Sequence, residues 1–179
     1  MLLALWLSIL AAQDAKRFVH PGTCGTCHVD EKKTRAPEPK LCLGCHDGAS
    51  AKLIAAHRGQ PFQNSVCSAC HSPHGSNAPK LIYDIPHGPF AGRHCDECHA
   101  EPEDGKIRIN GGSVKDLCLG CHVVIGNRLA ASKSGHAARL CTDCHTPHAS
   151  NFRPHLKMPR EKLCAACHKA VPAATAFVH

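Results

Sequence analysis

The sequence predicts a mostly irregular chain with short α-helices and little or no β-sheet, and three observations lead to this expectation. Among its 179 residues are 13 prolines and 14 glycines, which are scattered throughout and leave room only for short helices. Aromatic residues make up 4% of the chain, yet 14 residues are cysteine and 16 are histidine. Because aromatic side chains supply much of an ordinary core, something other than side chains must fill this interior.

The cysteines indicate what fills it, because all of them belong to seven Cys-x-x-Cys-His pentads. This spacing is the attachment signature of c-type haem. The two thiols add across the two vinyl groups of one porphyrin, and the adjacent imidazole binds the iron. We therefore expect seven haem c groups, one for about 26 residues, which replace the aromatic core. The anchoring residues are Cys24, Cys27, Cys42, Cys45, Cys67, Cys70, Cys95, Cys98, Cys118, Cys121, Cys141, Cys144, Cys164 and Cys167.

Other uses of cysteine fit this pattern poorly. Structural zinc usually takes two Cys-x-x-Cys knuckles per ion, and an odd number of knuckles, each followed by histidine, does not suit it. A disulfide framework gives no reason for a histidine after every second cysteine, and a thioredoxin-like redox pair gives no reason for seven copies.

The chain begins with an uncharged apolar run, residues 1–12. It is too short to cross a bilayer, which takes about 20 helical residues, but it suits the hydrophobic region of a signal peptide with a cleavage site at Ala11 and Ala12. No lysine or arginine precedes it, so a short hydrophobic segment that tethers the protein, or a short buried helix, stays open. Haem attachment occurs outside the cytoplasmic membrane, so we expect an exported periplasmic or extracellular protein without a transmembrane span.

Short helices are expected at residues 50–57 and 123–131, and at residues 170–178 with a start near Pro172. Residues 101–112 are rich in glycine and charge and are expected to form a loop, in which residues 106–109 could form one arm of a small hairpin.

The surroundings of the pentads repeat. In the first kind of pentad, a leucine directly precedes the first cysteine. A second continues as His-x-Pro-His, a small residue, Ser and Asn, at residues 67–77 and 141–151, and a third follows an upstream histidine. The order third, first, second occurs twice, and one more pentad of the first kind ends the series. We interpret residues 13–83 as a three-haem unit and residues 84–179 as its duplicate with an added haem, packed as one continuous haem chain.

The candidate iron ligands follow from these repeats. The histidines of the pentads are the expected proximal ligands: His28, His46, His71, His99, His122, His145 and His168. Seven histidines at matching positions of the repeats are the expected distal ligands: His20, His57, His74, His87, His136, His148 and His179. All seven haems are then bis-histidine ligated, and His94 and His155 are surplus. Methionine ligation has only Met1 and Met158 as candidates, which favours lower potentials.

The His-x-Pro-His segments add a geometric constraint. His71 is fixed under its own porphyrin, so His74, three residues later, cannot reach the far face of that ring. His74 is therefore expected to bind a neighbouring iron, and the same reasoning applies to His148 after His145. Such segments would hold two haems close together.

These residues resemble the periplasmic and extracellular multihaem cytochromes c, in particular those with a doubled CXXCH motif. The resemblance covers roughly residues 20–179, and the pentad pairs of residues 95–122 and 141–168 carry it. It departs at Cys67, whose unit lacks the second pentad of a doubled motif before Cys95. The resemblance implies electron transfer through closely stacked bis-histidine haems, in respiratory chains or toward extracellular acceptors.

Three functions are compared. An electron conduit needs both axial positions filled, and seven distal candidates match seven irons. A reductase of a small oxyanion, such as nitrite, hydroxylamine or tetrathionate, needs one open iron, and the chain contains no Cys-x-x-Cys-Lys pentad. A subunit of a cytochrome filament or outer-membrane complex is compatible with conduction. No nucleophilic triad, phosphate-binding loop or carboxylate pair stands out, so no catalytic residue is assigned.

The formal charge of +7 would suggest an anionic partner such as nucleic acid. A bis-histidine ferric haem adds about −1, however, so seven haems bring the total to about 0 when oxidised and about −7 when reduced. The expected partners are therefore redox proteins, including other cytochromes and quinol-linked or outer-membrane complexes, or further copies of this chain, and no nucleic acid is expected.

Overall fold

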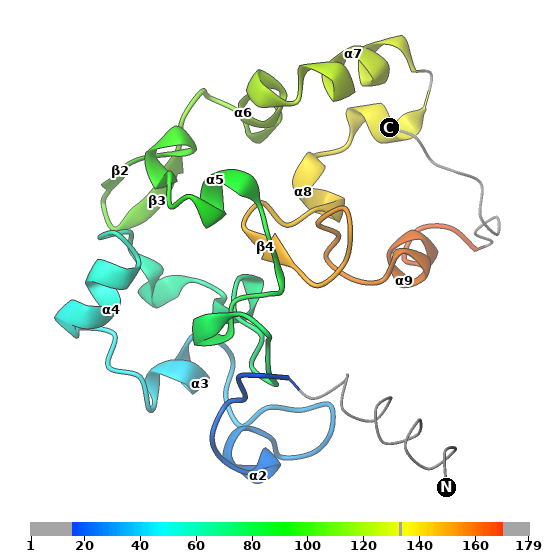
Figure 1. Ribbon diagram of the computed structural model, residues 1–179. Helices are drawn as coiled ribbons and strands as arrows, with labels where there is room; N and C mark the ends of the chain where they lie inside the picture. The colour runs from blue at the N-terminus through cyan, green and yellow to red at the C-terminus, as the bar shows by residue number, and fades with distance from the viewer. Residues whose placement is uncertain (1–15, 133, 170–179) are drawn as a thin grey trace, which may run out of the picture.

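The computed structural model describes residues 16–132 and 134–169, and its helices are short and joined by irregular segments (Figure 1). The expected segments 1–12 and 170–178, and the candidate ligand His179, lie outside the described residues. The α-helices are α2 (Cys24–Cys27), α3 (Lys40–Leu43), α4 (Ala51–Ala56), α5 (Gly88–Ala91), α6 (Val114–Cys121), α7 (Val123–Ala131), α8 (Cys141–Cys144) and α9 (Arg160–Ala165). Single 3-10 turns are η1 (Phe62–Asn64), η2 (Cys67–Ala69), η3 (Pro79–Leu81), η4 (Cys95–Glu97) and η5 (Gly135–Ala138).

The helices expected at residues 50–57 and 123–131 are confirmed as α4 and α7. Serine caps start two of the longer helices. The Ser50 hydroxyl accepts a hydrogen bond from Leu53 N–H before α4, and the Ser113 hydroxyl accepts one from Asp116 N–H before α6. These bonds satisfy backbone donors that the first turn of a helix leaves unpaired.

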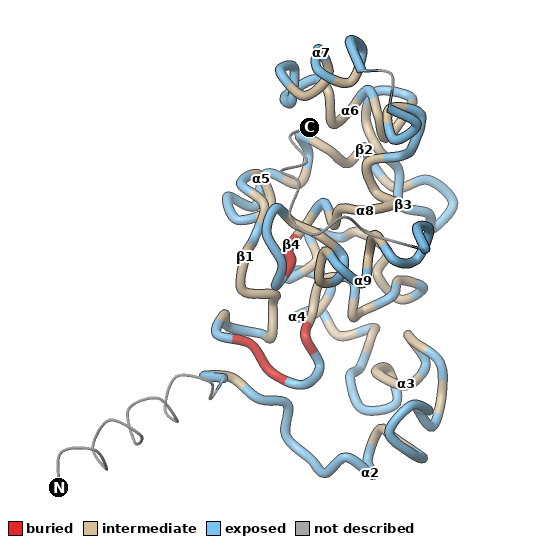
Figure 2. The backbone as a smooth tube through the Cα atoms, turned by 90° about the vertical axis from the view of Figure 1, so that its right-hand side faces the viewer, coloured by how far each residue is buried: buried red, intermediate tan, exposed pale blue. Residues whose placement is uncertain are grey.

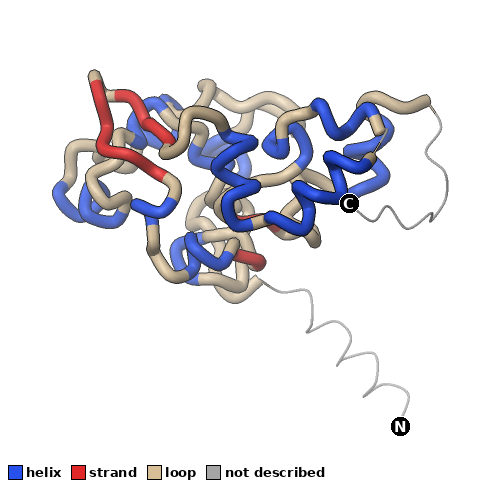
Figure 3. The backbone as a smooth tube through the Cα atoms, turned by 90° about the horizontal axis from the view of Figure 1, so that it is seen from above, coloured by secondary structure: helices blue, strands red, loops and turns tan. Residues whose placement is uncertain are grey.

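Sheet structure is limited to two antiparallel pairs in the described part of the chain, as expected. Strands β2 (His99–Glu103) and β3 (Lys106–Ile109) form a hairpin at one edge of the molecule (Figure 3). Asp104 and Gly105 connect them with φ of 51° and 67°, the two positive angles that a type I′ hairpin turn needs. The hairpin arm at residues 106–109 is confirmed, whereas the expectation of a loop at residues 101–103 was wrong, because these residues belong to β2, in which Glu103 lies opposite Lys106.

The second pair joins distant parts of the chain. Strand β1 (Ile85–Pro86) pairs with β4 (Ala149–Ser150), with Ile85 opposite Ser150. An isolated bridge repeats this arrangement earlier in the chain, where Phe18 pairs with Ser76 through two hydrogen bonds of 2.9 Å. Phe18 precedes His20 by two residues, just as Ile85 precedes His87. The same strand contact therefore places the upstream histidine in both repeats.

The side chains of the described residues do not form a conventional core. Among the described residues, Ala149 is the only buried hydrophobic residue, and buried positions are confined to short stretches of backbone (Figure 2). Large apolar side chains such as Val66 and Val124 are more than half exposed. This agrees with the expectation that the interior is filled by something other than side chains. In the described part of the chain, no helix has the length and apolar character needed to cross a membrane.

Candidate haem sites

The cysteine pentads share a local geometry that fits covalent haem attachment. The two cysteines of a pentad lie three residues apart on a helical turn, which places both side chains on one face. In six of the seven pentads the histidine backbone N–H donates to the carbonyl of the first cysteine at 2.8–3.0 Å. All 14 cysteines are free and at least partly accessible. Each pentad thus offers two thiols and an imidazole in a compact group, the donor set that haem c requires.

Six of the proximal candidates lie opposite a distal candidate. The pairs are His28 with His74, His46 with His20, His71 with His57, His99 with His148, His122 with His87, and His168 with His136. The ring centres within each pair are 5.7–6.3 Å apart.

This separation has a chemical meaning. An imidazole nitrogen binds a transition metal at about 2.0–2.1 Å, so two nitrogens on opposite sides of one ion are about 4 Å apart, and the ring centres about 6 Å apart. In the His99–His148 pair, the two Nε2 atoms face each other at 3.5 Å. The spacing of these pairs therefore fits one metal ion between two imidazoles.

Hydrogen bonds to backbone carbonyls fix several of these rings. The Nδ1–H groups of His71 and His145 donate to the carbonyls of Lys80 and Pro154, each at 2.8 Å. His99 Nδ1–H donates to a carbonyl in the same way at 3.2 Å.

Two distal candidates are held similarly: His57 Nδ1–H donates to the Leu53 carbonyl at 2.8 Å and His20 Nδ1–H to the Pro21 carbonyl at 2.9 Å. A carbonyl can only accept, so each Nδ1 carries the proton and Nε2 is left free to bind a metal.

Burial favours the same ligand form at His148. Burial, then the nearby His99 and His87, lower the pKa of His148. A neutral imidazole is the form that binds a metal ion.

His136 has a different neighbouring ring from its counterpart His57 in the first unit. His57 faces His71 of the next pentad, whereas the His136 ring lies 5.7 Å from that of His168, in the last pentad. The remaining distal candidate, His179, lies outside the described residues. The distal assignments made from the sequence stay predictions, and the structure adds which rings lie together.

The two surplus histidines have different surroundings. His94 is exposed, and its Nδ1 lies 2.9 Å from the Glu97 carboxylate. His155 contacts the edge of the His87 ring at 5.5 Å between centres. Burial, then His87 and His145, lower the pKa of His155, which keeps its imidazole neutral beside these rings.

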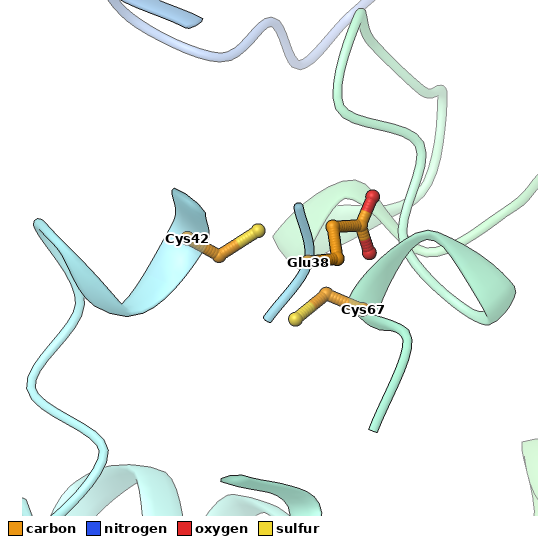
Figure 4. Close-up of side chains that lie close together, drawn as sticks. All are labelled: Glu38, Cys42 and Cys67. Atoms are coloured by element: carbon orange, nitrogen blue, oxygen red, sulfur yellow. The ribbon is translucent and has the colours of Figure 1, made fainter. Parts of the chain in front are cut away.

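One group of side chains was missed by the sequence reasoning: Glu38 lies beside the first cysteines of two successive pentads, Cys42 and Cys67, with ligand atoms within 4.8 Å of one another (Figure 4). The Glu38 carboxylate also accepts a hydrogen bond from Ser68 N–H at 2.9 Å. Burial, followed by the neighbouring Cys67, raises the pKa of Cys42 to about 11. A metal ion would require the thiolate, and haem attachment uses the same two thiols, so we interpret this cluster as two adjacent haem anchors.

A comparison with protein-family models agrees with this interpretation of the pentads. The model described as the doubled CXXCH motif matches residues 60–84, 87–125 and 134–173, which is more than half of the chain. The chain belongs to the doubled CXXCH motif family. The last two matched segments contain the two pentad pairs, and the first contains the single pentad at Cys67, where the sequence departs from the motif.

Membership of the doubled CXXCH motif family establishes a multihaem c-type cytochrome that binds haem covalently and takes part in electron transfer. The pentads at Cys24 and Cys42 lie outside the matched segments. Neither the curated proteins nor the solved structures compared with this chain gave a match.

Proposed function

We propose that this doubled CXXCH protein is a seven-haem electron conduit in which every iron has two histidine ligands. The observation that carries the proposal is the set of six opposed imidazole pairs, with ring centres 5.7–6.3 Å apart. When bound, each haem takes up and releases one electron at its iron. An iron with both axial positions filled offers no position to a substrate, so such a site suits electron transfer better than catalysis.

The protein's own residues would hold the ligands rigidly between oxidation states. The Nδ1–H bonds from His71 and His57 to carbonyls orient these rings and raise the basicity of the opposite nitrogen. A more basic ligand stabilises the ferric state. These bonds, together with the lack of methionine ligands, support low reduction potentials for the conduit.

Contacts between pentads support close packing of successive haems. The Sγ atoms of Cys42 and Cys67 lie within 4.8 Å of each other, and Cys141 is close enough to Cys118 to help raise the pKa of that thiol. Each pair joins the first cysteines of a first-kind and a second-kind pentad, one pair in each proposed unit. Haems anchored at such neighbours would have adjacent edges, which suits electron movement along a chain.

We propose His179, the seventh distal candidate from the sequence, as the distal ligand of one further haem. We further propose that the protein works outside the cytoplasmic membrane, in the periplasm or beyond, between redox proteins. The near-zero charge of the oxidised holoprotein calculated from the sequence favours such partners over nucleic acid.

The test is to count haems and axial ligands in the exported holoprotein. Intact mass should show seven covalent haems, and electron paramagnetic resonance of the oxidised protein should show only low-spin ferric iron. The reduced protein should not bind carbon monoxide rapidly. Fewer haems would refute the count, whereas a high-spin signal with turnover of nitrite, hydroxylamine or tetrathionate would refute the conduit in favour of a reductase.

A further inference from the structure

One contact joins the two halves of the candidate haem system. The Sγ of Cys70, the second anchor of the third pentad, lies 3.4 Å from Nδ1 of His148, which is 78 residues away. The other ring nitrogen of His148 faces His99 of the fourth pentad at 3.5 Å. One imidazole therefore contacts an anchor of one haem site and the axial histidine of another.

The backbone holds His148 in this position. His87 N–H donates to the His148 carbonyl at 2.8 Å, and β4 begins at the next residue and pairs with β1. A groove of about 240 Å³ lies beside the contact, lined by residues of both halves that include Ala69, Thr146 and Ala149. The two halves thus approach each other at a fixed place.

Haem attachment would preserve this contact in a changed form. A thiol can donate to Nδ1, but the thioether formed at Cys70 has no proton and can only accept weakly. With Nε2 on the metal, Nδ1 of His148 carries a proton that points at this sulfur. Several other candidate ligands donate Nδ1–H to a backbone carbonyl, so His148 differs from them by donating to the covalent anchor of a neighbouring haem.

We propose that His148 is the junction through which electrons cross between the haem anchored at Cys67 and Cys70 and the haem anchored at Cys95 and Cys98. This inference rests on the proposed axial ligation. One electron leaves a ferrous iron, which becomes ferric, and reduces the neighbouring ferric iron; no bond breaks and no proton moves. The imidazole and the Cys70 sulfur form a direct contact between the covalent anchor of one haem site and the axial histidine pair of another.

The test compares Cys70→Ala with Cys144→Ala in the full-length holoprotein. Cys144 is the counterpart of Cys70 in the second unit, so both variants lose one thioether bond from the same kind of pentad. His148→Ala first identifies the nuclear magnetic resonance signals of the haem that His148 binds, because those signals lose their low-spin character. We expect Cys70→Ala to shift these signals and Cys144→Ala to leave them in place. Cys70→Ser, whose hydroxyl again accepts from Nδ1, should move them back toward the wild-type positions.

A kinetic measurement tests the crossing itself. After a short pulse of reductant, redistribution of electrons between the halves should be slower in Cys70→Ala than in Cys144→Ala. Equal rates, or equal signal shifts in both variants, would overturn the junction while leaving the axial ligation intact. If His148→Ala converts no haem from low spin, the axial ligation fails first, and the junction fails with it.

A second measurement needs no substitution. In the wild-type protein, a nuclear Overhauser contact is expected between the His148 ring protons and the thioether protons at Cys70. Its absence from a fully assigned spectrum would also overturn the junction.

Discussion

Replacing His74 with alanine should leave the iron of the haem attached at Cys24 and Cys27 with a single axial ligand. The haem attached at Cys67 and Cys70, whose own histidine is His71, should keep both of its ligands. His74 belongs to the same His-x-Pro-His segment as His71, yet its ring lies 5.9 Å from His28. His71 faces a different ring, that of His57, at 6.3 Å. With the proposed ligation, the two imidazoles of this short segment would bind two different irons.

The expected magnitude follows from these pairs. His74→Ala removes one axial ligand from one haem in seven, so about one seventh of the low-spin ferric signal should disappear. His57→Ala should remove another seventh, because it acts on a different iron. The double variant should lose about two sevenths, since changes at independent sites add.

To identify the affected haem, the absorption band of each of the two candidate haems is shifted in turn by a cysteine substitution. Cys24→Ala leaves one vinyl group of the first haem unreacted, which moves its absorption band to longer wavelength, and Cys67→Ala does the same for the third haem. We expect His74→Ala to change the displaced band only in the Cys24→Ala background. A change in the Cys67→Ala background instead, or a low-spin signal at full intensity, would refute the pairing.

Two further predictions concern other residues. Asp84→Ala should lower the free energy of unfolding by about 2 kcal/mol in thermal or denaturant unfolding at pH 7, because four hydrogen bonds to a partly exposed carboxylate are lost. These bonds come from Lys16, Asn77 and Ser76. Burial alone would raise the pKa of Asp84, but these bonds outweigh it and lower the pKa. The stabilisation is therefore present above the unfolded-state pKa of about 3.9 and lost as the pH falls through the lower folded-state pKa, so the variant should lose less stability in acid than the wild type. His94→Ala should leave all low-spin signals unchanged, since His94 is an exposed residue paired with a carboxylate; loss of a seventh of the signal would make it an axial ligand.

Local features of this fold could be predicted from the sequence because their causes are local. Helix α4 begins after a capping serine, and the β2–β3 hairpin turns at Asp104 and Gly105, whose preference for positive φ is a property of these residue types. The boundary of β2 was missed because residues 101–103 carry no strand pattern of their own, and the strand is irregular there, with Glu103 opposite Lys106 after a shift in register.

The candidate ligands could be predicted as a set, but their partners could not. Matching positions in the repeats identified which histidines to consider, whereas a pairing such as His99 with His148 depends on how segments 49 residues apart are placed. His136 illustrates the limit, because its counterpart His57 faces His71 of the next pentad, whereas the fold places His136 beside His168 of the last pentad. The contact of Cys70 with His148 had no sequence signal, since it joins two units whose relative placement no repeat encodes.

The histidine pairs also help to explain how a chain with so little buried apolar surface can be stable in one fold. With Ala149 as the only buried hydrophobic residue among those described, apolar burial by side chains supplies little of the free energy that must offset the loss of backbone entropy. Each iron held by two imidazoles closes a loop between distant segments, and metal binding of this kind contributes directly to folding. In the second unit, for example, one iron would join His87 to His122. Without that iron, only the few backbone hydrogen bonds between β1 and β4 hold the segment of His87 in place. The strand contacts therefore set where each ligand lies, and the metal bonds would supply the strength that keeps it there.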